Sequence, residues 1–191
     1  SIGAYPPEET VRLAIEFWET GVRTLKFKTG VPGIDDVARL RAVRERLGDE
    51  PIFTIDANGA HETADEALAA IEALAPFNLK LAEQPTRRDR LSALAAVRRR
   101  SPVPIMADEA VFTVDELCEA LDLNAFDILS IYPGKNGGFT HSLTMAKMAQ
   151  EAGKPCAIGS NLETDLGQAS HVCLAASLSA FPIEELACDL M

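Results

Sequence analysis

Short apolar runs alternate with amphipathic stretches along the whole of this 191-residue chain. Such an alternation of strand and helix signals is typical of a parallel sheet with helices packed outside it, because each crossover returns the chain to the same edge. We therefore predict an α/β fold. The eight expected strands are Ile2–Tyr5, Thr24–Lys28, Phe53–Ala57, Lys80–Gln84, Pro104–Asp108, Asp127–Pro133, Pro155–Ser160 and Glu185–Leu190.

Seven helices are expected between these strands, with start and stop signals of the usual kind. The first stretch opens on prolines and glutamates and is followed by Gly21, which suits a helix start and a helix stop. The others follow the same scheme. The predicted helices cover 6–21, 35–49, 63–76, Asp89–Arg100, 113–125, Phe139–Gly153 and Asp165–Leu178.

Eight strands favour a closed barrel over an open, doubly wound sheet. An open sheet usually binds its ligand at a glycine-rich loop, and neither a G-x-G-x-x-G nor a Walker pattern follows any predicted strand. We predict a (β/α)7β TIM-like barrel that forms a single domain over residues 1–191.

One charged residue stands near the carboxyl end of each of five consecutive βα units. Their positions are separated by 28, 27, 25 and 27 residues, and they are Lys28, Asp56, Glu83, Asp108 and Lys135. The carboxyl ends of barrel strands converge on one mouth, where barrel enzymes keep their active sites. An alternative is that the acids only cap the helices that follow them.

The three carboxylates of Asp56, Glu83 and Asp108 would share one point of the mouth. Like charges so close cannot all stay ionised without a cation. Oxygen ligands with no His or Cys nearby favour a hard ion, so we predict Mg²⁺, with Mn²⁺ as the second choice.

Lys26 and Lys28 are two places apart in a strand and must point to the same face. Lys135 follows the strand expected opposite them. A neighbouring ammonium and a dication favour a neutral amine, so Lys26 would help Lys28 to act as a base. We predict removal of the proton next to a substrate carboxylate, with Lys28 and Lys135 as general base and acid. The enediolate formed would be stabilised by the metal and Lys26.

Six motifs in order, "KFK", "TIDANG", "LAEQP", "MADEA", "YPGKNGG" and "IGSNLE", resemble the enolase superfamily. The lysine pair, together with Lys135 after the sixth predicted strand, is similar to the pattern of its muconate-lactonizing (muconate cycloisomerase) subgroup. The resemblance implies the same barrel, the same Mg²⁺ ligands and the same acid/base lysines. It also implies that Asn58 and Glu109 support the metal ligands. Glu163 and Asp189 match positions that often face substrate, although a helix cap or a loop charge would explain them equally well.

Members of that superfamily carry an α+β capping domain before the barrel. This chain starts at the first predicted strand and stops in the eighth. We therefore expect the barrel portion of a longer protein, without the N-terminal capping domain.

Three alternative functions stay open from the sequence. A mandelate racemase-like sugar-acid dehydratase would place a histidine opposite the lysines, but His61, His141 and His171 fall in predicted loops or helices. A non-catalytic barrel fragment would have no need of costly buried charges. A Schiff-base aldolase would use a barrel lysine but would give the three carboxylates no purpose.

The formal net charge of −11 argues against a nucleic-acid or anionic-membrane partner. No apolar stretch is long enough to span a membrane. The four cysteines form no C-x-x-C pair, so we expect neither zinc nor disulfides and a cytoplasmic protein. The expected partners are a small carboxylate substrate and further copies of the chain in a homo-oligomer.

Overall fold

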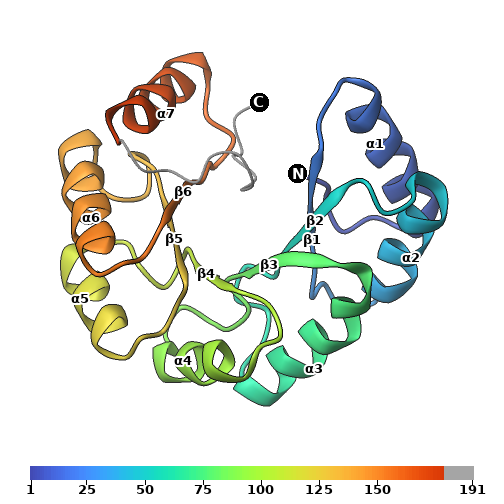
Figure 1. Ribbon diagram of the computed structural model, residues 1–191, viewed down its shortest axis with the longest axis horizontal. Coiled ribbons are helices and arrows are strands. Elements are labelled where there is room, and N and C mark those ends of the chain that lie inside the picture. The colour runs from blue at the N-terminus through green and yellow to red at the C-terminus, as the bar shows by residue number, and fades with distance from the viewer. Residues whose placement is uncertain (179–191) are drawn as a thin grey trace.

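Six parallel strands form one sheet in chain order in the computed structural model, which describes residues 1–178. The sheet curves into a partial barrel (Figure 1). The strands are β1 (Thr24–Lys28), β2 (Ile52–Asp56), β3 (Leu79–Glu83), β4 (Ile105–Ala107), β5 (Ile128–Ile131) and β6 (Cys156–Ile158). The predicted α/β class and parallel order are confirmed.

The helices lie outside the strands, so that the strands form an inner wall (Figure 1). They are α1 (Pro7–Glu19), α2 (Asp36–Leu47), α3 (Ala64–Leu74), α4 (Leu91–Arg100), α5 (Val114–Asp122), α6 (Phe139–Glu151) and α7 (Asp165–Ser177), with a 3-10 turn η1 (Ala75–Phe77) after α3. All seven predicted helices are present, with ends displaced by a few residues.

The first predicted strand, Ile2–Tyr5, is wrong as a strand. Only Ile2 pairs, through an isolated parallel bridge to Phe27, and its N–H donates to the carbonyl of Lys26 at 2.7 Å. The chain turns at Tyr5, which donates to the carbonyl of Gly3, and the two prolines that follow cannot donate to a ladder. The eighth predicted strand, Glu185–Leu190, lies outside the described residues.

Three of the strands are shorter than predicted, and a proline borders one end of each. Pro104 and Pro155 precede β4 and β6, and Pro133 follows β5. Proline has no N–H for a sheet ladder, so pairing starts after it or stops before it. Three paired strands were predicted without a proline: β1 has the predicted bounds, and β2 and β3 are each displaced by one residue toward the N-terminus.

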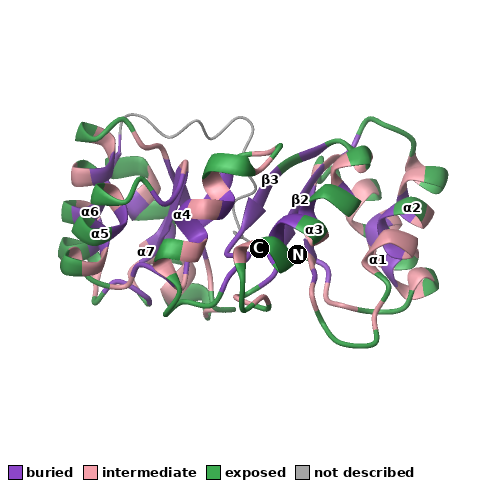
Figure 2. Cartoon of the chain, turned by 90° about the horizontal axis from the view of Figure 1, so that it is seen from below, coloured by how far each residue is buried: buried purple, intermediate pink, exposed green. Residues whose placement is uncertain are grey.

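The hydrophobic core has two parts, on the two faces of the curved sheet. The larger part packs between strands and helices and includes the fully buried rings of Phe27 and Phe53, whose centroids are 4.8 Å apart. A small separate cluster fills the barrel interior: Leu81, Met106, Ile128 and Ala157. Figure 2 shows the strands buried and the outer faces of the helices exposed.

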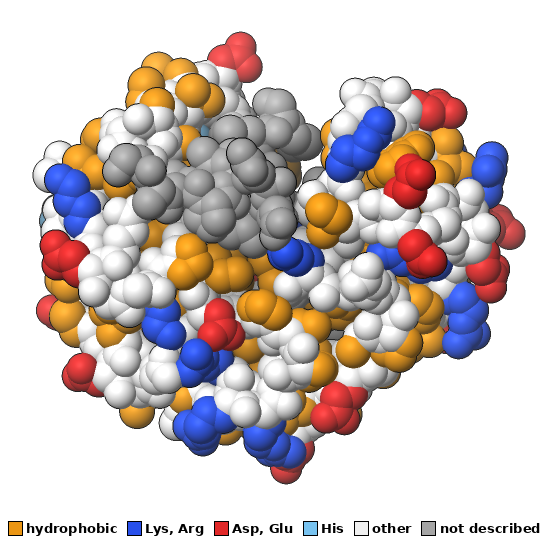
Figure 3. All heavy atoms as spheres, viewed as in Figure 1, with side chains coloured by type: hydrophobic (Ala, Val, Ile, Leu, Met, Phe, Trp, Pro, Cys, Tyr) orange, Lys and Arg blue, Asp and Glu red, His pale blue; other side chains and the backbone are white. Residues whose placement is uncertain are grey.

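Acidic and basic side chains are interspersed round the outside of the molecule (Figure 3), and several form surface ion pairs. Exposed pairs of this kind contribute little to stability. Over residues 1–178, no helix is both long and apolar enough to cross a membrane.

Candidate active site

The parallel register aligns three charged residues in one row at the carboxyl ends of the strands. Lys28 of β1 pairs with Asp56 of β2, which pairs with Glu83 of β3. Side chains alternate along a strand. Leu81, two residues before Glu83, belongs to the interior cluster, so the row faces the barrel interior. Met106 of β4, which pairs with Glu83, belongs to the same cluster, so Asp108 continues the row just after β4.

The two lysines of β1 share one carboxylate. Nζ of Lys28 lies 2.5 Å from Asp56 Oδ2, and Nζ of Lys26 lies 3.4 Å from the same oxygen. Lys26 also lies 2.6 Å from Glu83 Oε2. Lys26, Asp56 and Glu83 are buried, whereas the Lys28 side chain keeps 34% of its surface exposed. Of the two ammonium groups, Lys28 is therefore the one that a ligand in the mouth can reach.

Lys135 and Asp108 form a second buried pair. Nζ of Lys135 donates to Asp108 Oδ1 at 2.9 Å, to the carbonyl of Asp108 at 3.1 Å and to the carbonyl of Ser130 at 2.6 Å. The Lys135 side chain has no exposed surface. An ammonium group has three N–H donors, so all three are used within the fold.

Asn58 links Lys28 and Asp56 to Glu109, which follows Asp108 in the chain. Its side-chain oxygen accepts from Lys28 Nζ at 2.9 Å and its side-chain nitrogen donates to Glu109 Oε1 at 2.7 Å. Its main-chain N–H donates to Asp56 Oδ1. The other carboxylate oxygen of Glu109 is buried with no hydrogen-bond partner among the described residues.

The pKa values of the buried acids are shifted in different directions. The pKa of Glu83 is raised to about 8, chiefly by burial and also by the charges of Asp56 and Asp108, against the lowering effect of Lys26. Burial also acts to raise the pKa of Asp108, but the charge and hydrogen bond of Lys135 outweigh it and the pKa is lowered. Burial and the charge of Asp108 raise the pKa of Glu109. Perturbed carboxyls at one barrel mouth are typical of functional sites.

The alternative role for these acids, as helix caps, is wrong. The helices after β2 and β4 are capped by Thr63 and Thr113, each in a capping box with a glutamate three residues later. Arg90 precedes α4. Asp56, Glu83 and Asp108 therefore cap no helix.

An open cavity of about 430 Å³ adjoins the carboxylates. It is lined by Asn58, Gly59, Arg87, Arg88, Asp89 and Glu109. A small molecule in this cavity would contact Asn58 and Glu109. Asn58 contacts Lys28 and Asp56 of the charged row, and Glu109 follows Asp108 in the chain.

The donor set fits a hard divalent cation, although the carboxylates are paired with lysines in this structure. Asp56, Glu83 and Asp108 supply only oxygen atoms as ligands. Glu109 Oε2, which has no hydrogen-bond partner among the described residues, is a further acceptor beside them. Within residues 1–178, no group of three or more His, Cys, Asp and Glu side chains is already arranged around a metal position. Lys26 lies between Asp56 and Glu83 and balances their charge.

The family described as enolase C-terminal domain-like matches residues 9–190. This chain belongs to that family. The enolase-family barrel is 34% identical over 180 residues to an L-Ala-D/L-Glu epimerase of Bacillus subtilis, which covers 93% of the chain and 49% of the relative. It is 36% identical over 185 residues to an o-succinylbenzoate synthase of Thermobifida fusca, which covers 95% of the chain and 56% of the relative.

Solved structures of similar proteins have the same fold as this chain. A dipeptide epimerase of Enterococcus faecalis V583 superposes with a TM-score of 0.90 at 32% identity, over 100% of this chain and 55% of its own. A mandelate racemase/muconate lactonizing family protein of Azoarcus sp. EbN1 superposes with a TM-score of 0.89 at 30% identity, over 100% and 50%. The chain spans about half the length of the curated relatives it matches.

One predicted site residue that the structure describes, Glu163, lies outside the carboxylate row. Glu163 holds its own loop after β6, where its carboxylate accepts from Ser160 Oγ at 2.5 Å and from the N–H of Asn161 at 2.9 Å. Burial acts to raise the pKa of Glu163, but the hydrogen bonds from Ser160 and from main-chain N–H groups together outweigh it, and the pKa is lowered. Asp189 lies outside the described residues.

The histidines of the enolase-family barrel do not join the row. His141 is exposed on α6, and His61 is half-buried in the loop after β2. His171 is fully buried on α7, edge-to-face with the ring of Tyr132 at 5.8 Å between centroids. These positions agree with the expectation that they are surface or packing residues.

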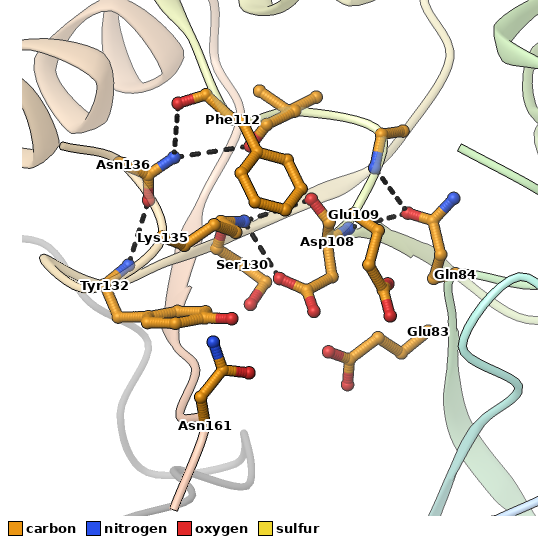
Figure 4. A network of polar contacts seen from close by, with 12 residues as sticks. Glu83, Gln84, Asp108, Glu109, Phe112, Ser130, Tyr132, Lys135, Asn136 and Asn161 are labelled. Atoms are coloured by element: carbon orange, nitrogen blue, oxygen red, sulfur yellow. Dashed lines mark hydrogen bonds and ion pairs between the residues drawn. The ribbon is translucent and has the colours of Figure 1, made fainter. Parts of the chain in front are cut away.

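Two buried carboxamides that the sequence analysis missed hold the segment that carries Asp108 (Figure 4). Gln84 Oε1 accepts from the N–H groups of Asp108 at 2.9 Å and Ala110 at 3.1 Å. Asn136 Nδ2 donates to the carbonyls of Val111 and Phe112 at 3.3 and 3.2 Å. Gln84 has a φ of +35°, which is rare for a residue other than glycine. The only sequence signals are the motifs "EQP" and "KNGG" themselves.

Proposed function

We propose that this barrel removes the α-proton of a small carboxylate substrate in a Mg²⁺-dependent reaction of the epimerase, racemase or cycloisomerase type. The observation that carries the proposal is the inward-facing row in which Lys28 lies 2.5 Å from Asp56, which pairs in turn with Glu83. A lysine that substrate can reach, beside carboxylates that can hold a cation, is the arrangement that proton removal and stabilisation of an enediolate need.

Asp56, Glu83 and Asp108 would hold the magnesium ion. When bound, the ion would supply positive charge for the substrate carboxylate and for the negative charge that develops on proton removal. The support is the all-oxygen donor set and the metal in relatives: an E. faecalis dipeptide epimerase was solved with Mg and the dipeptide L-Leu-L-Tyr. That structure is 33% identical to this chain with a TM-score of 0.87.

Lys28 is the proposed general base. It must give up a proton to become a free amine, and its exposed fraction lets substrate reach Nζ. Lys26 is buried against Asp56 and Glu83, so we assign it to charge stabilisation beside the substrate carboxylate.

Lys135 is the proposed general acid on the opposite face, as the sequence predicts. Its three donors contact Asp108 and Ser130 in this structure. One of them would turn to the substrate to deliver a proton.

The substrate class that we propose is a dipeptide or an N-acylated amino acid. The support is the kinds of relatives: epimerases of dipeptides and N-succinylamino acid racemases are 29–36% identical to this chain. The sugar-acid dehydratase reading loses support, because His171, the buried histidine, lies on an outer helix behind Tyr132.

The test is exchange of the α-proton for deuterium, followed by NMR in D₂O. The protein as its organism makes it would be mixed with Mg²⁺ and a panel of dipeptides, N-succinylamino acids, muconates and sugar acids. Lys28→Met should slow exchange by about 10²–10⁴-fold. Lys147→Met, an exposed lysine on α6, is the matched control. Exchange that persists in Lys28→Met, or without Mg²⁺, would contradict the proposal.

A further inference from the structure

The cavity of about 430 Å³ beside the charged row carries two arginines, Arg87 and Arg88, on the loop between β3 and α4. Asn58 and Glu109 line the same cavity. Because Asn58 also contacts Lys28 Nζ at 2.9 Å, the cavity begins one side chain away from the proposed base. A substrate that reaches Lys28 can therefore extend past Asn58 toward the arginines.

The donors of Arg87 are used within the fold. Its Nη1 lies 2.8 Å from Glu62 Oε1, and its Nε and Nη2 donate to the two carboxylate oxygens of Asp89 at 3.1 and 3.2 Å. Asp89 lines the cavity as well. The charges of Arg87 and Asp89 therefore offset each other on this wall.

Arg88 is held in a different way, by one face and one edge of its guanidinium group. Its Cζ lies 4.4 Å from the centroid of the Phe112 ring, and its Nη2 donates to Glu116 Oε1 at 2.7 Å. The other oxygen of Glu116 accepts from the main-chain N–H groups of Phe112 and Thr113. Both supports of Arg88 are thus fixed at the start of α5, while its side chain stays 52% exposed.

Arg88 keeps donors that no other group uses. A guanidinium group has five N–H donors on two edges that can bind a carboxylate, and within residues 1–178 its only acceptor is Glu116. Stacking and the ion pair restrict the group before a ligand arrives, which reduces the entropy lost on binding. Glu109 is not its partner, because its Oε1 accepts from Asn58 and its carboxylate points toward Glu83 (Figure 4).

We propose that Arg88 is a specificity-determining residue that binds a second carboxylate of the substrate, away from the reacting carbon. This inference rests on the proposed function. The reacting carboxylate would lie at the row with Lys28, and the second would lie in the cavity and accept charge-assisted hydrogen bonds from Arg88. The substrate is then a dicarboxylate. The acidic side chain of a dipeptide and an N-succinyl group both supply the second carboxylate.

Two matched pairs of compounds test Arg88 in the protein as its organism makes it. L-Ala-L-Glu is compared with L-Ala-L-Gln, and N-succinyl-L-phenylalanine with its terminal amide, so that each pair differs by one charge. Rates of α-proton exchange in D₂O with Mg²⁺ give kcat and KM for each compound. The wild-type protein should favour the acid of at least one pair by about 10–100-fold in kcat/KM, and that pair identifies the source of the carboxylate.

Arg88→Met should lose this preference through a higher KM for the acid, with kcat and KM for the amide unchanged. Arg88→Lys keeps the positive charge without the planar fork, so it should keep part of the preference. Arg99→Met, at an exposed site near the end of α4, is the matched control and should behave like the wild-type protein.

Binding of the same four compounds, measured by titration calorimetry with Mg²⁺, gives a readout that needs no turnover. A preference for the acid that Arg88→Met removes, without exchange of any compound, would support the role of Arg88 and contradict the proposed function. The role of Arg88 is overturned if the wild-type protein prefers the acid of neither pair. It is also overturned if Arg88→Met weakens binding of acid and amide equally.

Discussion

The guanidinium of Arg39 donates to the main-chain carbonyl of Lys28 at 2.7 Å. Arg39 is fully buried on α2 and also donates to the carbonyl of Gly3 and to Asp36 Oδ1, both at 2.5 Å. One side chain of a helix therefore holds the end of β1, which carries the proposed base, and the segment that pairs beside it.

Replacement of Arg39 should destabilise the fold. Arg39→Met would leave two buried carbonyls and the Asp36 carboxylate without their partner, and breaking a buried pair costs about 3–5 kcal/mol. The free energy of unfolding, measured by urea titration, should fall by that amount. Arg41→Met, at an exposed site of the same helix, should stay within about 0.5 kcal/mol of wild type. Equal effects of the two substitutions would contradict the assignment.

The stability of the metal-free protein should depend on Glu83. Its pKa is about 8 in the folded state, against an ordinary value of 4.5, so the native state binds one more proton than the unfolded chain between these pH values. The free energy of unfolding must then fall as pH rises from about 4.5 to 8. Glu83→Gln should remove this fall.

Urea titrations in EDTA at pH 5 and pH 8 measure the effect of Glu83. Glu83→Gln should gain stability relative to wild type at pH 8, while the difference shrinks at pH 5. A difference that is independent of pH would contradict the raised pKa. Because the carboxyl must ionise to bind a cation, Mg²⁺ binding near pH 7 should also release a proton, which calorimetry in buffers of different ionisation enthalpy can detect.

Asn58 should matter both for its backbone and for its amide. Its φ is +45°, a conformation that costs most residues about 1–2 kcal/mol. Asn58→Gly keeps the turn but loses the contacts with Lys28 and Glu109, so it should slow α-proton exchange with a small loss of stability. Asn58→Ala should lose both the contacts and the favoured turn conformation, so it should slow α-proton exchange and also lower the free energy of unfolding. Asn124→Ala, at an exposed site with a φ of +49°, should lose stability alone.

Gln84 should support the segment that holds Asp108. Gln84→Met would leave the buried N–H groups of Asp108 and Ala110 without an acceptor, and each unsatisfied group costs about 1–3 kcal/mol. Both the free energy of unfolding and the affinity for Mn²⁺ should fall. An unchanged Mn²⁺ affinity in a destabilised variant would show that Gln84 supports the fold and not the ligand set.

Much of the fold and half of the site follow from local patterns in the sequence. Strand and helix periods predict the parallel α/β order, and the position of Lys28, Asp56 and Glu83 at strand ends predicts their shared row. These features depend on residues a few places apart, because alternation along one strand and the carboxyl ends of parallel strands are local geometry. The prolines beside β4, β5 and β6 were also visible, yet their effect on strand length was underestimated.

What only the tertiary structure decided concerns side chains whose partners are far away in the chain. The regular spacing of Lys135 can be read from the sequence, but its hydrogen bonds to Asp108 and Ser130 cannot. These bonds form only because β4 and β5 are adjacent in the sheet. Charge and spacing can be read from the chain itself, whereas burial and the satisfaction of donors depend on the packing of segments distant in sequence.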